Sequence, residues 1–328
     1  MPVILHISDL HYYRPQWSSL AQCAKTMLAP HLRTYANFAL NPNRWYRNHL
    51  LPSLATFVNE LPEHQRPSLL LNTGDLTATG NTQELHAANH ATTVFRSQLS
   101  NPSIPAVTLP GNHDVYHQRS EKGIEQITAS WLSKSESKDF YKTRVHTINI
   151  DDHWELITLD LSPDKALGKA FGAFDEKTKK KLLDTVRHLS HKNIILAAHW
   201  PFHAMHNKNN ELIGKESLRD ICHRHKNIYG YFHGHTHIPS IINQTDNHGN
   251  SCLTAEPGPF GARAFPWQRA GTLFSKNATI ASRAHLIELS DKQLCVTPII
   301  YDVSLKHFTL SIPSIAPIQQ LPTHESFP

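Results

Sequence analysis

The sequence predicts an α/β domain in which buried strands alternate with helices. Short, nearly continuous apolar runs recur along the chain, and each run ends in a cluster of small polar residues. Runs of this length are typical of strands that are covered on both faces. Helical patterns lie between them, and strands interleaved with helices favour a layered α/β architecture.

Five apolar runs are followed directly by polar residues. We expect strands at residues 3–7, 69–71, 106–109, 194–198 and 228–232. In open α/β sheets, ligands bind outside the carboxyl ends of the strands. The polar residues after these five runs are therefore the candidates for a functional site.

A helix is expected between the third and fourth of these strands and the end of the next apolar run. Asp175 is placed to cap it, and the spacing of Leu182, Val186 and Leu189 predicts an apolar stripe on one face. Beyond residue 251 the pattern becomes mostly strand-like, at residues 251–255, 285–289, 295–301 and 308–312. These later runs predict a second sheet.

Composition indicates an ordinary soluble globular protein of 328 residues, with 18% charged and 39% hydrophobic residues. No linker or repeat divides the chain, so we expect one domain at 1–313 and a tail at 314–328. The four cysteines lie far apart, which argues against a disulfide framework and a thiolate zinc site. No apolar run reaches 18 residues, and the first residues do not resemble a signal peptide, so a cytoplasmic location is expected.

Histidine is so abundant that a single histidine motif is weak evidence. With 25 histidines, about two His-x-His pairs are expected by chance, and the chain has three. The clusters that follow strands are more informative. They supply nine candidate side chains: Asp9, His11, Asp75, Asn112, His113, Asp114, His199, His235 and His237.

These nine side chains offer oxygen and imidazole nitrogen atoms and no sulfur. Such donors suit Mn, Fe, Zn or Mg ions better than a structural zinc bound by thiolates. An aspartate can bridge two cations through its two oxygens, so a two-metal site is a reasonable expectation. Because residues two apart face the same side of an extended segment, His235 and His237 can both face the ions. Gly234 permits a tight turn and a close approach of the backbone, and His233 is left to packing or to support of the ligands.

Five motifs occur in a fixed order, each after an expected strand. They are Asp9-Leu10-His11, Gly74-Asp75, Gly111-Asn112-His113-Asp114, His199, and Gly234-His235-Thr236-His237. This order resembles the calcineurin-like metallophosphoesterase family. The resemblance implies a four-layer α/β/β/α sandwich of two mixed β-sheets flanked by helices. It also implies a hydrolase of phosphoesters or pyrophosphates that uses metal-activated water.

The resemblance assigns a role to each motif residue. It implies one divalent ion held by Asp9, His11, Asp75 and His237. Asp75 would bridge to a second ion, which Asn112, His199 and His235 would also hold. His113 would be the catalytic acid, with Asp114 orienting it. Manganese is the expected metal, with Fe, Zn and Mg as alternatives.

Two stretches without acidic residues set this chain apart. Residues 12–59 carry five basic residues and several aromatic ones, where roughly four acidic residues would be expected. We treat about 12–60 as an insertion, and residues 257–287 form a second acid-free stretch. Their arginines are the candidates for substrate contact: Arg14, Arg33, Arg44, Arg47, Arg263 and Arg269. Such a surface suits an anionic membrane or single-stranded nucleic acid, and the alternative is ordinary core aromatics with solvated arginines.

The overall plan resembles the longer UDP-2,3-diacylglucosamine pyrophosphatases of lipid A biosynthesis. That likeness implies hydrolysis to UMP and 2,3-diacylglucosamine 1-phosphate, by an enzyme peripheral to the cytoplasmic face of the inner membrane. A cyclic-nucleotide or other soluble phosphodiesterase is the alternative. A nuclease, which would show steep salt dependence, and a non-catalytic scaffold are less favoured, and the sequence predicts no oligomeric state.

Overall fold

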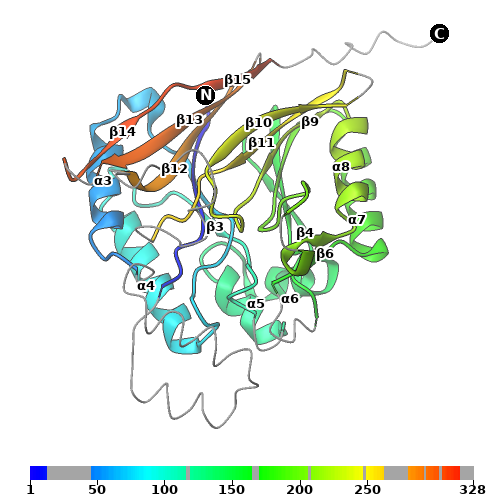
Figure 1. The fold of residues 1–328 in the computed structure, drawn as a ribbon, viewed down its shortest axis with the longest axis horizontal. Helices are drawn as coiled ribbons and strands as arrows, with labels where there is room; N and C mark the ends of the chain where they lie inside the picture. Colours follow the sequence, from blue (N-terminus) through cyan, green and yellow to red (C-terminus); the bar gives the residue numbers. More distant parts are fainter. Residues whose placement is uncertain are drawn as a thin grey trace.

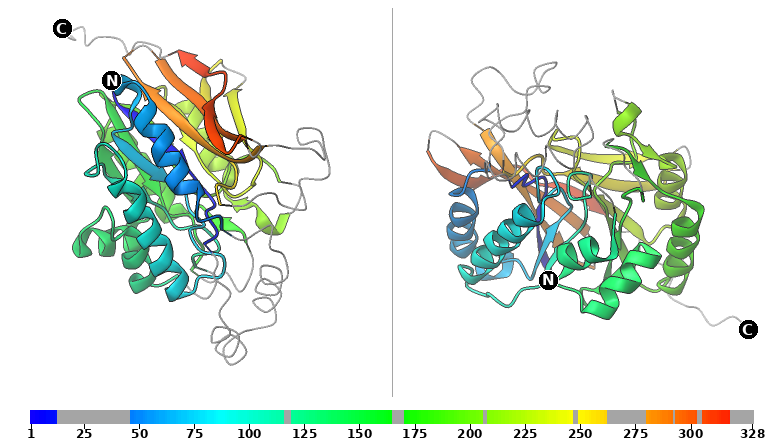
Figure 2. Two further views of the ribbon diagram at one scale, coloured as in Figure 1. Left: turned by 90° about the vertical axis from the view of Figure 1, so that its left-hand side faces the viewer. Right: turned by 90° about the horizontal axis from the view of Figure 1, so that it is seen from below.

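Two β-sheets pack face to face, and helices cover the outer side of each (Figures 1 and 2). The computed structural model describes residues 1–12, 46–115, 119–164, 170–205, 208–246, 249–261, 280–291, 293–302 and 305–317. Both sheets contain parallel and antiparallel strands. The predicted four-layer α/β/β/α sandwich is therefore confirmed.

The first sheet combines the two ends of the chain. Its strand order is β14 (His307–Leu310), β13 (Gln293–Asp302), β12 (Ile280–Leu289), β1 (Val3–Ile7), β2 (Leu69–Asn72) and β3 (Ala106–Thr108), and β15 (Ser314–Pro317) also pairs with β13. Strands β1, β2 and β3 run parallel, so their carboxyl ends share one edge. Strand β12 runs antiparallel to β1 on its other side.

The second sheet comes from the middle of the chain. Its strand order is β10 (Ser240–Thr245), β11 (Ser251–Glu256), β9 (Ile228–Phe232), β7 (Asn193–Ala197), β5 (Trp154–Leu159) and β4 (Val145–Asn149). Strands β5, β7, β9 and β11 run parallel, which again gathers their carboxyl ends. The short strands β6 (Gly172–Ala173) and β8 (Leu212–Ile213) pair with each other.

Helices close both outer faces. On the first sheet, α3 (Leu50–Glu60) contacts β14 and α5 (Glu121–Thr128) contacts β3, with α4 (Thr82–Ser97) packed against both helices. On the second sheet, α7 (Glu176–His188) contacts β4, and α8 (Lys215–Arg224) contacts β9 and β11. Helix α6 (Lys134–Thr143) lies between α5 and α7, and single 3-10 turns occur at Glu63–Gln65 and Lys208–Asn210.

The expected helix start at Asp175 is confirmed. Its carboxylate accepts a hydrogen bond of 2.7 Å from the Thr178 amide, as an N-cap does, and Leu182 and Val186 are buried. The continuous apolar runs also have a clear cause. In the second sheet Leu156 packs toward the first sheet, whereas Ile157 packs toward the helices, so successive residues are all buried.

The strands beyond residue 251 were expected to form a second sheet, and this is only partly correct. Strand β11 joins the second sheet, but β12, β13 and β14 extend the first one beside β1. Ile4 lies opposite Ile287 in this pairing. A strand pattern shows which residues are buried but not which strand is the partner, so the sequence could not distinguish these arrangements.

Part of the expected insertion belongs to the core. Within residues 12–60, helix α3 buries Leu54 and Val58, and Phe57 contacts Phe308. Residues 13–45 lie outside the described residues. Residues 314–317, expected to start a tail, form β15 instead. None of the helices in the described ranges is long and apolar enough to cross a membrane.

Candidate metal centre

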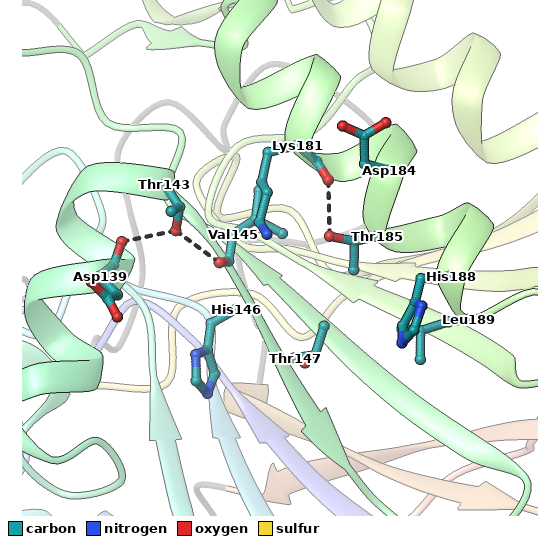
Figure 3. Close-up of a pocket in the computed structure, with 10 residues that line it drawn as sticks. All are labelled: Asp139, Thr143, Val145, His146, Thr147, Lys181, Asp184, Thr185, His188 and Leu189. Carbon is teal, nitrogen blue, oxygen red and sulfur yellow. Dashed lines mark hydrogen bonds between the residues drawn. The ribbon is translucent and has the colours of Figure 1, made fainter.

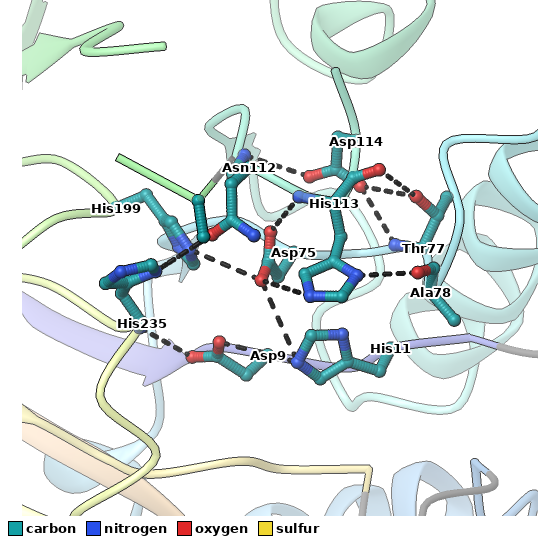
Figure 4. A network of polar contacts seen from close by, with 12 residues as sticks. Asp9, His11, Asp75, Thr77, Ala78, Asn112, His113, Asp114, His199 and His235 are labelled. Carbon is teal, nitrogen blue, oxygen red and sulfur yellow. Dashed lines mark hydrogen bonds and ion pairs between the residues drawn. The ribbon is translucent and has the colours of Figure 1, made fainter. Parts of the chain in front are cut away.

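The chain turns sharply where each motif leaves its strand. Five of the seven non-glycine residues with positive φ in the described part of the chain are predicted metal ligands: Asp9, His11, Asp75, His235 and His237. Left-handed conformations cost on the order of 1 kcal/mol or more for such residues and concentrate at functional sites. The turns bring side chains from both sheets toward one point (Figure 4).

Four of these side chains form a first cluster. The ligand atoms of Asp9, His11, Asp75 and His237 all lie within 4.8 Å of one another, and all four residues are buried. Nε2 of His237 is 3.0 Å from Nε2 of His11 and 3.0 Å from Oδ1 of Asp9. Nε2 of His11 is 3.8 Å from Oδ2 of Asp75. Donors about 2.1 Å from a common ion must themselves lie about 3.0–4.2 Å apart, so this cluster fits a cation.

A second cluster lies on the other side of Asp75. Nε2 of His199 is 3.4 Å from Oδ2 of Asp75 and 3.2 Å from Oδ1 of Asn112. Nδ1 of His235 is 2.8 Å from the same Asn112 oxygen and 3.3 Å from Nε2 of His199. One oxygen of Asp75 thus faces both clusters. The structure brings all seven predicted ligands together, and the donor set suggests a dinuclear site for divalent metals.

Backbone carbonyls fix which nitrogen of two imidazoles faces the centre. Nδ1 of His199 lies 2.9 Å from the Thr73 carbonyl, and Nε2 of His235 lies 2.9 Å from the Asn210 carbonyl. A carbonyl can only accept, so these nitrogens carry the hydrogen and donate it. The opposite nitrogen of each ring is then directed at the centre, where its lone pair is available to a metal.

Electrostatics keep the centre anionic and its imidazoles available. Burial raises the pKa of Asp9, but His237, through its charge and a hydrogen bond, brings that pKa well below its usual value. Burial lowers the pKa of His235 to about 3 and also lowers that of His11. His199 behaves differently: burial lowers its pKa, but the nearby Asp75 raises it to about 9. A cation must therefore displace a proton from His199, as is usual for metal binding.

His113 lies at the edge of the centre. Its side chain is 13% exposed, and Nε2 is 3.9 Å from Oδ2 of Asp75. Its Nδ1 donates to the Ala78 carbonyl at 2.6 Å, so Nε2 is the nitrogen that faces the metal donors. Burial lowers its pKa, and Asp75 and the Ala78 carbonyl offset this only in part.

Asp114 was expected to orient His113, but its hydrogen bonds have other partners. The carboxylate accepts from the amides of Leu76, Thr77 and Gly111 and from the Thr77 hydroxyl. The His113 ring is held by Ala78 instead. Asp114 therefore ties the loop after β3 to the loop after β2. Burial and the neighbouring Asp75 raise its pKa to about 7.

The alternating histidines reach the centre for a different reason from the expected one. Strand β9 ends at Phe232, and His235 and His237 have φ values of 77° and 58°, so residues 234–237 form a turn and not an extended segment. Gly234 is required for close approach, because a Cβ there would lie 1.9 Å from Oγ of Ser8 and 2.5 Å from Oδ2 of Asp9.

Two residues that support this turn carry no recognisable sequence signal. Glu256, fully buried at the end of β11, accepts a hydrogen bond from the hydroxyl of Thr236. Its Oε2 also lies 3.4 Å from Nδ1 of His233. Burial raises the pKa of Glu256 well above its usual value.

Of the six candidate substrate arginines, only Arg47 falls in the described residues. It is half-buried, and its amide donates to the Gly261 carbonyl at 3.2 Å. Arg14, Arg33, Arg44, Arg263 and Arg269 lie outside the described residues.

A cavity of about 450 Å³ lies elsewhere, between α6, β4 and α7 (Figure 3). Lys181, Asp184 and His188 of α7 line one side, and His146 of β4 contributes to the other. It contains none of the seven predicted ligands, so it is separate from the metal centre.

Comparison with known proteins agrees with this architecture. Residues 2–239 match the family model described as Calcineurin-like phosphoesterase. A dimetal phosphatase from Danio rerio is 13% identical and has a TM-score of 0.61, with 97% of this chain and 99% of that chain covered. A phosphatase from Mycoplasma pneumoniae is 11% identical with a TM-score of 0.40, covering 96% and 93% of the two chains. No curated protein matched the chain. At these identities the solved structures bear on the fold alone.

Proposed function

Because the chain belongs to the calcineurin-like phosphoesterase family, we propose that its centre is a dinuclear metal site that hydrolyses a phosphodiester or pyrophosphate. The observation that carries this proposal is the position of Asp75. Its Oδ2 is 3.8 Å from Nε2 of His11 and 3.4 Å from Nε2 of His199, so a single oxygen faces both donor clusters.

The donors also account for a phosphate substrate. Asp9 and Asp75 are the carboxylates among the seven donors, and together they offset only half the charge of two divalent ions. A loaded centre therefore stays positive and attracts a phosphate group. Two such ions, when bound, supply the Lewis acidity that activates water and offsets phosphoryl charge.

His113 is proposed to move the proton in this reaction. Its Nδ1 is held by the Ala78 carbonyl, and its Nε2 faces the Asp75 side of the centre. An anionic phosphoester beside this ring would favour the imidazolium form. The ring could then donate its Nε2 proton to the oxygen of the leaving group. Asp114 acts at a distance, by fixing the loop that carries His113.

The substrate we put forward first is UDP-2,3-diacylglucosamine, with UMP and 2,3-diacylglucosamine 1-phosphate as products. Support comes from where the described ends of the two acid-free stretches lie. The Phe260 amide donates to the Ser8 carbonyl, directly before Asp9, and the Arg47 amide donates to Gly261. The Tyr12 and Tyr46 rings are 4.7 Å apart at the same place. Basic and aromatic stretches therefore both leave the fold beside the metal donors.

Manganese is the proposed metal because the donors are oxygen and imidazole nitrogen without sulfur. A lipid substrate further implies work at the cytoplasmic face of a membrane, where the basic residues of the acid-free stretches would meet anionic headgroups. A soluble phosphodiesterase is the competing function. The small size of its substrate predicts that turnover is independent of residues 13–45.

The first test compares two variants of the Mn-loaded protein on aryl and alkyl phosphodiesters. Asp75→Ala should abolish metal binding at both positions and, with it, turnover. His113→Ala should retain its metal content and lose turnover by about 10²–10⁴-fold. The loss should be large for an alkyl leaving group and small for a nitrophenyl one, because the latter leaves without protonation.

His86→Ala on the exposed side of α4 is the matched control and should behave like wild type. An active Asp75→Ala protein, or a His113→Ala protein without metal, would contradict the assigned roles. For the substrate, UDP-diacylglucosamine, a cyclic nucleotide and single-stranded DNA are compared in parallel. If cyclic nucleotide is the better substrate, and removal of residues 13–45 leaves its turnover intact, the lipid proposal is wrong.

A further inference from the structure

The turn at residues 234–237 carries one imidazole for each donor cluster, and its shape is strained. His235 faces Asn112 and His199, whereas His237 faces Asp9 and His11. Both have left-handed φ values, 77° and 58°. Two such residues two positions apart persist only where surrounding contacts hold them. The residues that hold this turn therefore set the spacing between the two clusters.

Part of that support comes from the first sheet and from within the turn. The His235 amide donates to Oδ2 of Asp9 at 3.2 Å. The Thr236 amide donates to the Gly234 carbonyl, and the Ile238 amide donates to the Thr236 hydroxyl at 3.1 Å. Thr236, which lies between the two imidazole ligands, is thus a junction of the turn, and its hydroxyl has its own hydrogen to donate.

That hydrogen goes to Glu256, which is fixed beside the turn. Glu256 ends strand β11, whose residue Ala255 pairs with Phe232 and accepts a 3.0 Å hydrogen bond from the His233 amide. Oε2 of Glu256 accepts from the Thr236 hydroxyl and lies 3.4 Å from Nδ1 of His233, which also lies 3.1 Å from the Gly234 carbonyl. One carboxyl oxygen therefore contacts side chains on both sides of Gly234.

We propose that Glu256 is a positioning residue for the metal centre, which acts through the Thr236 hydroxyl to hold His235 and His237 at the spacing that two cations require. The inference rests on the proposed dinuclear function and adds a residue to it. Glu256 touches neither substrate nor cation. Its role is that of a hydrogen-bond acceptor, so an amide oxygen in the same place should serve as well.

The experiment measures Mn²⁺ binding, by electron paramagnetic resonance of the free ion, and the visible absorption of the Co²⁺-loaded protein. Glu256→Ala and Thr236→Val should each weaken Mn²⁺ binding about 10–100-fold, the range found for residues that orient metal ligands. Each should also change the Co²⁺ spectrum. Glu256→Gln and Thr236→Ser, which keep the acceptor and the donor, should bind within a factor of about three of wild type.

A double-mutant cycle tests whether the two residues act as one unit. Glu256→Ala combined with Thr236→Val should bind Mn²⁺ no more weakly than the worse single variant, because both remove the same hydrogen bond. Glu155→Ala is the matched control. Glu155 is also a buried glutamate on a strand of the second sheet, so its loss should lower stability and leave Mn²⁺ affinity unchanged.

The outcomes separate this inference from the function on which it rests. If wild type binds no Mn²⁺, the dinuclear proposal fails. If wild type binds two ions and folded Thr236→Val or Glu256→Ala binds them equally well, only the role of Glu256 is wrong. Strictly additive effects in the cycle would also overturn it. Should Glu256→Ala not fold, the comparison of Thr236→Val with Thr236→Ser decides the question.

Discussion

Single residues here show that burial, more than any one neighbour, sets the protonation of acidic groups outside the metal donors. Glu84 is 5% exposed, and its carboxylate accepts hydrogen bonds from the amide and hydroxyl of Thr79 at 2.9 and 3.0 Å. Burial still raises its pKa to about 7 against a usual 4.5, because these bonds offset desolvation only in part. The folded protein therefore binds this proton more tightly than the unfolded chain does.

A pH-dependent penalty follows for Glu84. Its favourable contribution is fully present below about pH 4.5 and is lost as the pH rises through about 7, because the unfolded chain loses the proton first. The loss amounts to about 3 kcal/mol. We expect Glu84→Gln to match wild type near pH 4 and to exceed its free energy of unfolding near pH 8, by urea denaturation at both pH values. An equal difference at both would contradict the assignment.

At the scale of elements, the important finding is that one face of the chain mixes core with insertion. Helix α3 lies inside the stretch expected to be an insertion, yet it packs against β14 and α4. Its buried residues include Leu54, which is 0% exposed, and Val58. A basic, acid-free composition thus says little about whether a segment is an appendage, because the buried stripe of a helix needs no acidic residues.

Loss of α3 packing should destabilise the whole domain. Leu54→Ala is expected to lower the free energy of unfolding by about 2–5 kcal/mol, the range for deleting a buried leucine side chain. Thr56→Ala on the exposed side of the same helix should change it by less than about 0.5 kcal/mol. Thermal or urea unfolding measures both. A Leu54→Ala protein as stable as wild type would mean that α3 is an appendage after all.

At the scale of the molecule, the metal centre ties the two sheets together. The first sheet supplies Asp9, Asp75 and Asn112, and the second supplies His199 and His235. Metal-free, the interface between the sheets holds carboxylates and imidazoles beside left-handed backbone. Ions that bind only the folded chain should therefore stabilise the assembly of sheets as well as equip it for chemistry.

Metal removal should lower the melting temperature. An ion at 100 times its dissociation constant stabilises by about 2.7 kcal/mol for each site, so chelation should remove a stabilisation of this order for each ion. Differential scanning fluorimetry with and without chelator, followed by Mn²⁺ titration, measures it. Asp75→Ala should show no such response. A wild-type melting temperature that ignores both chelator and Mn²⁺ would contradict a shared site between the sheets.

Much of the centre could be predicted from the sequence because its residues follow strands in a fixed order. The strand ends at Ile7, Phe232 and three other positions are where the expected motifs begin. What could not be predicted depends on contacts between distant segments. The partner of β12, the support of Thr236 by Glu256, and the role of Ala78 all join residues that no local pattern relates. The left-handed turns were equally hidden, since aspartate and histidine tolerate them without requiring them.

The position of β1 between β2 and β12 has a consequence for synthesis. All seven metal donors have been translated by residue 237, but one edge of β1 has no partner until residues 280–289 follow. During translation, the growing chain therefore exposes an unpaired apolar strand edge while its ligands already exist. Such edges recruit other strands, so a polypeptide ended at residue 239, where the family match stops, should aggregate on release from the ribosome.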